Sequence, residues 1–166
     1  LPDIAVHLHL FYVDLLDEFV EFFNNIPVAF DLFISCVDGK SVEYIKQKSS
    51  QISNVRKVTV RKMKNRGRDI APLYVGFGPE IKNYKYFLHV HSKKSKHIKE
   101  GGADWRQYSL RALVGSDKTV ARILSYFENG SNVGLVYPNP DGYIPATGYT
   151  WLGNKDSGKA FLESIG

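Results

Sequence analysis

Residues 84–95 read Tyr-Lys-Tyr-Phe-Leu-His-Val-His-Ser-Lys-Lys-Ser, an apolar run that changes abruptly into a polar, cationic one. The aromatic and branched residues of its first half are typical of β-structure, and they predict a buried strand over Tyr84–His91. In open α/β sheets, ligands bind at the carboxyl ends of the strands, which is where this run becomes polar. Because side chains alternate along a strand, His89 and His91 share one face. Two imidazoles followed by Lys93 and Lys94 therefore indicate a site for an anionic ligand.

The same side chains also have structural explanations. A histidine in a strand is usually a hydrogen-bonded structural residue, and a Lys-Lys pair is usually part of a solvated loop. A third explanation is a metal site, because His89 and His91 offer two ligand nitrogens, but the sequence shows no obvious third ligand. The single cysteine is too few for a cysteine-based structural zinc site. We therefore expect no cofactor, with a divalent ion such as Mn²⁺ or Mg²⁺ left open.

Composition limits the class of protein. A chain of 166 residues is long enough for one domain with a substantial core. One cysteine, Cys36, excludes an internal disulfide framework and suits a reducing compartment. No apolar run approaches the roughly 20 residues that span a bilayer. The net charge is +5, and 13 of the 22 Lys and Arg residues lie between Arg56 and Lys99, opposed only by Asp69 and Glu80. Such a field attracts nucleotide phosphates, nucleic acid or an acidic membrane surface.

Strand-like and helix-like patterns alternate along the whole chain. Strands are predicted at Ile4–Leu10, Ala29–Cys36, Val55–Val60, Tyr84–His91 and Val133–Tyr137. Helices are predicted at Asp14–Asn24, Ser41–Lys48, Ile70–Val75, Trp105–Val114 and Ser116–Phe127, with a last one from about Asp156. The alternation predicts one α/β domain over residues 1–166, with a mostly parallel sheet covered by helices on both faces. We expect Ser92–Asp104 to be a loop, and Gly76 and Gly78-Pro79 to end the third helix.

Three loops of such a sheet can converge on one edge. They carry His9, Phe11 and Tyr12 after the first strand, Asn65–Asp69 after the third, and His91, Lys93 and Lys94 after the fourth. A nucleoside diphosphate requires an aromatic surface for its base, a carboxylate for its ribose and cations for its diphosphate, and these loops supply all three. We therefore predict ligand-binding roles for His9, Tyr12, Asn65, Arg66, Gly67, Arg68, Asp69, His89, His91, Lys93 and Lys94.

The segment Asn65-Arg66-Gly67-Arg68-Asp69 has two compatible interpretations. In the structural one, Asp69 caps the helix that begins at Ile70, and Gly67 provides a close turn. In the functional one, Asp69 also faces the ligand, and Arg66 or Arg68 pairs with a phosphate near the helix N-terminus. The chain contains no Gly-rich phosphate loop, no dinucleotide fingerprint and no Asp-x-Asp.

Several blocks together resemble the rhamnan synthesis protein F family, glycosyltransferase-like proteins of bacterial surface polysaccharide assembly. The blocks are Val6–Tyr12, Asp31–Ser35, Asn65–Leu73, His89–Ser95, Trp105-Arg106 and Leu113–Ser116, and they follow one another at matching spacing over nearly the whole chain. The resemblance implies a fold related to the GT-A (Rossmann-like) glycosyltransferases. It also implies transfer of rhamnose, or of a related hexose or furanose, from a nucleotide-diphosphate donor to a glycan or lipid-linked acceptor of rhamnan, O-antigen or capsule type.

Departures from the pattern of GT-A enzymes shape the expected mechanism. Those enzymes usually hold a divalent metal with an Asp-x-Asp where this chain has His89-Val90-His91. The loss of two carboxylates removes hard oxygen ligands, and Lys93 and Lys94 add positive charge, so we expect metal-independent transfer. Family members continue beyond the position of Gly166, so we expect a chain shortened at its C-terminus and further domains beyond it. We expect a cytoplasmic location, which includes the inner face of the cell membrane as a place of peripheral contact.

The catalytic base is left open among three residues. An inverting transfer needs an Asp, Glu or His within hydrogen-bond reach of the acceptor hydroxyl, and Asp104, Asp141 and His91 are the candidates. Asp141 also fits a simple Pro-Asp-Gly turn.

A non-catalytic module that binds nucleic acid or another polyanion is the main rival interpretation, although we expect no nucleic-acid partner. It would use the basic band with Tyr84, Tyr86 and Phe87 as stacking surfaces.

Overall fold

The computed structural model describes residues 3–94, 102–129, 132–139 and 154–165. Side chains are described from Trp105 onward in the helix that begins at Gly102. The chain divides into two compact units, residues 1–136 and 137–166. The prediction of a single domain over 1–166 stays a prediction.

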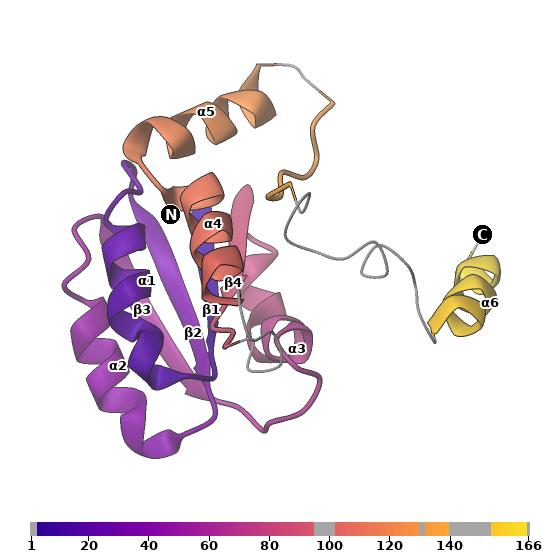
Figure 1. Cartoon of the computed structure of the whole chain (residues 1–166), viewed down its shortest axis with the longest axis horizontal. Helices are drawn as coiled ribbons and strands as arrows, with labels where there is room; N and C mark the ends of the chain where they lie inside the picture. Colours follow the sequence, from indigo (N-terminus) through magenta and orange to yellow (C-terminus); the bar gives the residue numbers. More distant parts are fainter. Residues whose placement is uncertain (1–2, 95–101, 130–131, 140–153, 166) are drawn as a thin grey trace. The chain divides into compact units, whose positions relative to one another are not determined.

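A four-stranded parallel sheet forms the centre of the first unit (Figure 1). Its strands are β1 (Ile4–Leu10), β2 (Phe30–Cys36), β3 (Val55–Lys62) and β4 (Tyr86–His91), in the order β3-β2-β1-β4. The two inner strands are almost entirely buried, as expected where helices cover both faces. The edge strand β3 carries exposed Arg and Lys side chains, which discourage pairing with another chain.

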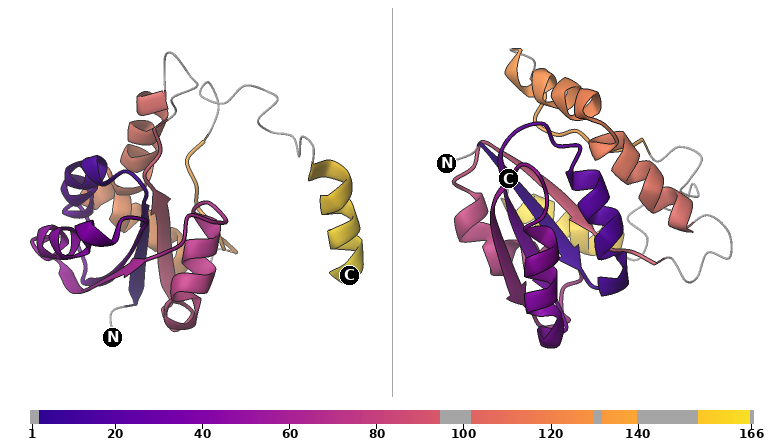
Figure 2. Two further views of the ribbon diagram at one scale, coloured as in Figure 1. Left: turned by 90° about the horizontal axis from the view of Figure 1, so that it is seen from below. Right: turned by 90° about the vertical axis from the view of Figure 1, so that its left-hand side faces the viewer.

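Helices and short 3₁₀ turns connect the strands. They are η1 (Val13–Leu15), α1 (Leu16–Phe23), η2 (Gly39–Ser41), α2 (Val42–Ser49), α3 (Ile70–Ile81), α4 (Gly102–Val114) and α5 (Asp117–Glu128). The second unit contains α6 (Lys155–Ile165). Alternating side chains of the strands divide the apolar residues into two clusters. The larger cluster packs α1, α2, α4 and α5 against one face, and the smaller cluster packs Leu73, Phe77 and Ile81 of α3 against the other (Figure 2). This confirms the predicted α/β architecture.

The third helix is longer than its sequence predicts. It continues past Gly76, Gly78 and Pro79 to Ile81, although a proline inside a helix removes one backbone hydrogen bond. Packing outweighs this cost, because Phe77 and Ile81 are buried against the sheet. The guanidinium of Arg61 on β3 also donates to the carbonyl of Gly76.

Two other predictions are wrong. Residues 132–139 form no strand, although Val133–Tyr137 has the composition of one; Leu135 and Tyr137 are exposed there and gain no core contact. The expected loop Ser92–Asp104 is shorter, because α4 begins at Gly102. In contrast, Ser116 caps α5 as predicted, with its hydroxyl accepting from the amide of Thr119. Within the described residues, no helix has both the length and the apolar character needed to cross a membrane.

Candidate functional site

Four of the five histidines of the chain meet on one face of the sheet. The parallel register of β1 and β4 places His7 beside His89 and His9 beside His91. Alternation along each strand then directs all four rings to the face that α3 covers, while Leu8 and Val90 join the core on the other face. This confirms that His89 and His91 share a face.

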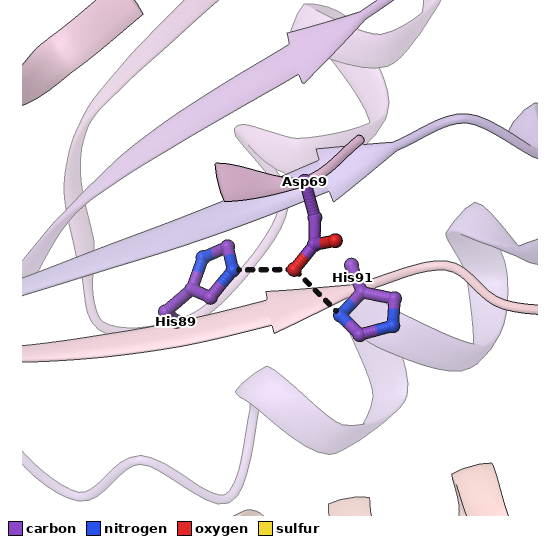
Figure 3. Close-up of side chains that lie close together, drawn as sticks. All are labelled: Asp69, His89 and His91. Carbon is purple, nitrogen blue, oxygen red and sulfur yellow. Dashed lines mark hydrogen bonds and ion pairs between the residues drawn. The ribbon is translucent and has the colours of Figure 1, made fainter. Parts of the chain in front are cut away.

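Asp69, at the start of α3, meets the histidines of β4. Its Oδ2 lies 3.2 Å from Nε2 of His89 and 3.4 Å from Nδ1 of His91 (Figure 3). Both rings therefore point toward one carboxylate oxygen, from a residue 20 positions before His89 in the chain. The side chain of Asp69 is 23% exposed and that of His91 is 40% exposed, so the cluster is open to solvent on one side.

The backbone before Asp69 is bent to aim this carboxylate. Gly67 has φ of 71° and Arg68 has φ of 53°, which is the left-handed region. A Cβ at Gly67 would lie 2.2 Å from the Cβ of Ala71, so only glycine fits. Asp69 occupies the N-cap position of α3, but its side chain makes no capping hydrogen bond. Simple helix capping therefore does not explain why an aspartate stands at this position. Its carboxylate contacts His89 and His91 instead.

A buried chain of hydrogen bonds continues behind His89. Nδ1 of His89 lies 2.9 Å from Nδ1 of His7, and Nε2 of His7 lies 3.1 Å from Oγ of Ser35. The same hydroxyl lies 2.8 Å from Nδ1 of His9. With a proton on Nε2 of His89, that nitrogen donates to Asp69, and His7 donates to His89 from Nδ1. The Ser35 hydroxyl then donates to His7 and accepts from His9, so each of these four contacts pairs one donor with one acceptor.

Burial keeps the inner histidines neutral. Burial, together with the neighbouring His89 and His9, lowers the pKa of His7 from 6.5 to about 3. Burial also lowers the pKa of His9 and of His91, against the opposing effect of the Asp69 carboxylate. For Asp69, burial alone would raise the pKa, but the hydrogen bond to His89 and the charge of His91 outweigh it and hold the pKa below its ordinary value. An anionic Asp69 carboxylate beside His89 and His91 results.

The loops after β1 and β4 are joined near this cluster. The amide of Tyr12 donates to Oγ of Ser92 at 2.9 Å. The Lys94 ammonium pairs with Asp14 and lies 5.1 Å from the centre of the Tyr12 ring, so this lysine already has an anionic partner. Lys93 is exposed, and only its backbone carbonyl is bound, by Nη1 of Arg106 at 2.8 Å, among the described contacts.

Besides Tyr12, Gly67, Lys93 and Lys94, whose positions are described above, the predicted residues divide into three groups. The structure brings Asp69, His89 and His91 into contact and links His9 to His89 through Ser35 and His7. Asn65, Arg66 and Arg68 are exposed on the approach to α3, and in the described part of the chain neither arginine has an ion-pair partner. Among the candidate bases, the side chain of Asp104 and the whole of Asp141 lie outside the described residues.

Sequence reasoning missed His7 and Ser35. The signal for His7 was a second His-x-His, His7-Leu8-His9, on a strand that could pair with the strand of His89 and His91. Nothing local distinguishes Ser35, whose role follows from its register opposite His9.

Most of the aromatic residues expected to stack on nucleic acid are in contact with other side chains of the protein. The Tyr84 hydroxyl donates to Asp31 at 2.6 Å, and its ring packs against Phe33. Tyr86 packs against Phe127, and only Phe87, at 55% exposure, presents a free ring face among these three. The geometry gives little support to a stacking platform.

Comparisons with known proteins agree with the resemblance seen in the sequence. The family model described as rhamnan synthesis protein F matches residues 2–164. The chain is 33% identical over 157 residues to an uncharacterized protein, WxcX, of Xanthomonas campestris pathovar campestris, and 32% identical to its counterpart in a second strain. These matches cover 94% of this chain but 22% of each relative, so the chain spans about a fifth of their length. No solved structure matches significantly. With a match over nearly its full length, the chain belongs to the rhamnan synthesis protein F family.

Proposed function

We propose that this chain is the donor-binding domain of a glycosyltransferase that adds a sugar, rhamnose or a related hexose or furanose, to a bacterial surface polysaccharide. The observation that carries the proposal is the position of the Asp69–His89–His91 cluster. It lies at the carboxyl ends of the strands beside the β1–β4 pair, where the strand order reverses. In open α/β sheets, nucleotides bind at this switch point.

The surrounding charges suit a nucleoside diphosphate. Arg66 and Arg68 are exposed just before the N-terminus of α3, where backbone amides also favour anions. Lys93 is exposed two residues after the end of β4. We propose that these three cations bind the diphosphate. Lys94 instead fixes the loop after β4 through its contacts with Asp14 and Tyr12.

In the proposed reaction, the acceptor hydroxyl oxygen forms a bond to the anomeric carbon while the bond from that carbon to the diphosphate breaks. The hydroxyl proton passes to a base, and the nucleoside diphosphate leaves with the bonding electrons. Cations beside the leaving group stabilise the charge that develops on it. The base is one of the three predicted candidates, His91, Asp104 and Asp141.

A thermal-shift panel of nucleoside diphosphates and nucleotide sugars tests the proposal. A ligand that binds only the folded state at about 100 times its Kd adds about 2.7 kcal/mol of stability, which is a readily measured shift in Tm. We expect one class of nucleotide sugar to give a selective shift, and the Arg66→Ala/Arg68→Ala variant to lose it.

A matched control removes the same charge elsewhere. Lys118→Ala/Arg122→Ala deletes two exposed cations of α5 and should keep the shift. If both double variants lose binding equally, with a steep salt dependence and no preference among nucleotides, the domain is a general polyanion binder and the proposal is wrong.

A further inference from the structure

The geometry of the cluster matches part of a metal coordination shell. The ligand atoms of Asp69, His89 and His91 all lie within 4.8 Å of one another. Two ligands that each stand about 2.1 Å from a metal, at angles between tetrahedral and octahedral, are roughly 3.0–3.4 Å apart. The carboxylate oxygen stands 3.2 Å from one imidazole nitrogen and 3.4 Å from the other. A small closure of the two rings would bring all three ligand atoms to one cation.

The three side chains leave room for other ligands. They come from two elements, β4 and the turn that leads into α3 (Figure 3). The side chain of His91 is 40% exposed and that of Asp69 is 23% exposed, so solvent reaches the cluster. Three protein ligands with open positions are typical of metal sites that bind substrate, whereas structural sites are closed.

His89 also has the support that metal-binding histidines require. A ligating imidazole normally donates its other N–H to a second residue, which fixes the ring and its tautomer. When Nε2 of His89 binds a metal, the proton of the ring is on Nδ1, and this N–H donates to Nδ1 of His7 at 2.9 Å. His7 then donates from Nε2 to Ser35, whose hydroxyl donates to Nδ1 of His9. The buried chain therefore satisfies the metal-bound tautomer as fully as the metal-free one.

We propose that Asp69, His89 and His91 bind one divalent first-row transition-metal ion. Two imidazoles and one carboxylate favour Mn²⁺, Fe²⁺, Co²⁺ or Zn²⁺ over Ca²⁺ and Mg²⁺, which prefer oxygen ligands. The inference departs from the expected metal-independent transfer, because the third ligand is Asp69, whose position beside β4 only the fold reveals. With His91 bound to the metal, Asp104 and Asp141 are left as the candidate bases. The role of the metal ion in binding the diphosphate rests on the proposed function, whereas the existence of the metal site does not.

The test uses the full chain with Co²⁺ alone, without nucleotide. Calorimetry should show one ion per chain, and visible absorption should show the bands of a nitrogen- and oxygen-coordinated Co²⁺. We expect His91→Ala and Asp69→Asn each to weaken binding by more than about 100-fold. His7→Gln, which replaces the residue that contacts Nδ1 of His89, should weaken it by about 10- to 100-fold, as for other residues that orient a ligand.

Controls separate this site from adventitious binding. Asp117→Asn removes an exposed carboxylate on α5 and should bind Co²⁺ as the unmodified chain does. Far-ultraviolet circular dichroism shows whether each variant is folded, and half-exposed His91 is the ligand whose loss should disturb the fold least. The proposal is wrong if the chain binds no stoichiometric Co²⁺, or if folded His91→Ala and Asp69→Asn variants bind it unchanged.

A second arm assigns the role of the ion. If the nucleotide sugar found above binds more tightly with Mn²⁺ than with EDTA, the ion belongs to the donor site. Equal affinity in both buffers would show that the ion takes no part in donor binding. The Co²⁺ measurement would still show whether the metal site exists. Failure of all nucleotides to bind counts against the proposed function, and the Co²⁺ measurement is independent of it.

Discussion

His7 is the residue whose chemistry is most altered by the fold. It is fully buried between His89 and Ser35, and its ring also contacts Phe77. Its pKa of about 3 in the folded protein compares with 6.5 as its ordinary value. Only a neutral imidazole can accept one hydrogen bond and donate another, so the low pKa is a condition for the buried chain to exist.

The shifted pKa of His7 predicts a pH dependence of stability. Below pH 6.5 the unfolded chain takes up a proton at His7, whereas the folded chain does so only near pH 3. The contribution of His7 to the free energy of unfolding is therefore complete above pH 6.5. It is lost as the pH falls toward 3, by about 1.4 kcal/mol per pH unit. Urea unfolding in metal-free buffer at pH 7.5, 6.0 and 5.0 measures this slope.

Comparison with His7→Gln isolates the part due to this residue. The variant is expected to be less stable at pH 7.5, because a buried partner of His89 changes shape, but its stability should fall less steeply with acid. His9 and His91 have lowered pKa values too, so some slope should remain. An unchanged slope in a cooperatively folding variant would show that His7 is not the group responsible.

At the scale of elements, the turn before α3 determines where Asp69 lies. Gly67→Ala should destabilise the protein by about 1–3 kcal/mol, because alanine is strained at φ of 71° and its Cβ would collide with Ala71. It should also weaken Co²⁺ binding by moving the carboxylate. Urea unfolding and calorimetry measure the two effects.

Gly78, inside α3, provides the matched control for the glycine in the turn before it. A Cβ at Gly78 meets no atom within 4 Å, and alanine favours a helix interior over glycine by about 1 kcal/mol. Gly78→Ala should therefore raise stability and leave Co²⁺ binding unchanged. Equal losses in the two variants would mean that α3 tolerates no alteration at all, and that the turn at Gly67 has no special role.

Strand and helix predictions succeeded where neighbouring residues determine the structure, and failed where contacts between distant parts of the chain determine it. Runs of apolar and branched residues located β1 and β2 to within one residue, and Ser116 marked the start of α5. Glycine and proline gave a wrong end for α3, because contacts of Phe77 and Ile81 with the sheet outweigh local propensity. The fifth predicted strand has suitable residues, but no strand in the described chain pairs with them.

At the scale of the molecule, the same distinction applies to the site. The sequence predicted that the loops after β3 and β4 converge, and it named Asp69, His89 and His91 among the ligand-binding residues. It did not predict that these three meet, since this depends on how α3 crosses the sheet. The role of His7 was hidden for a similar reason, because it depends on the β1–β4 register, a long-range property.

The last prediction concerns the chain beyond residue 136. Every member of the two hydrophobic clusters lies between Ile4 and Leu124, and α6 buries none of its residues. We therefore expect a chain cut after Val136 to unfold cooperatively, with its Tm within about 4 °C of the full chain, a shift that corresponds to roughly 1 kcal/mol. It should also bind Co²⁺ with unchanged affinity, because Asp69, His89 and His91 all lie in the first unit. Loss of cooperative unfolding would show that residues 137–166 are part of the same folding unit. Retained folding with weaker nucleotide-sugar binding would instead assign those residues, Asp141 among them, to the substrate.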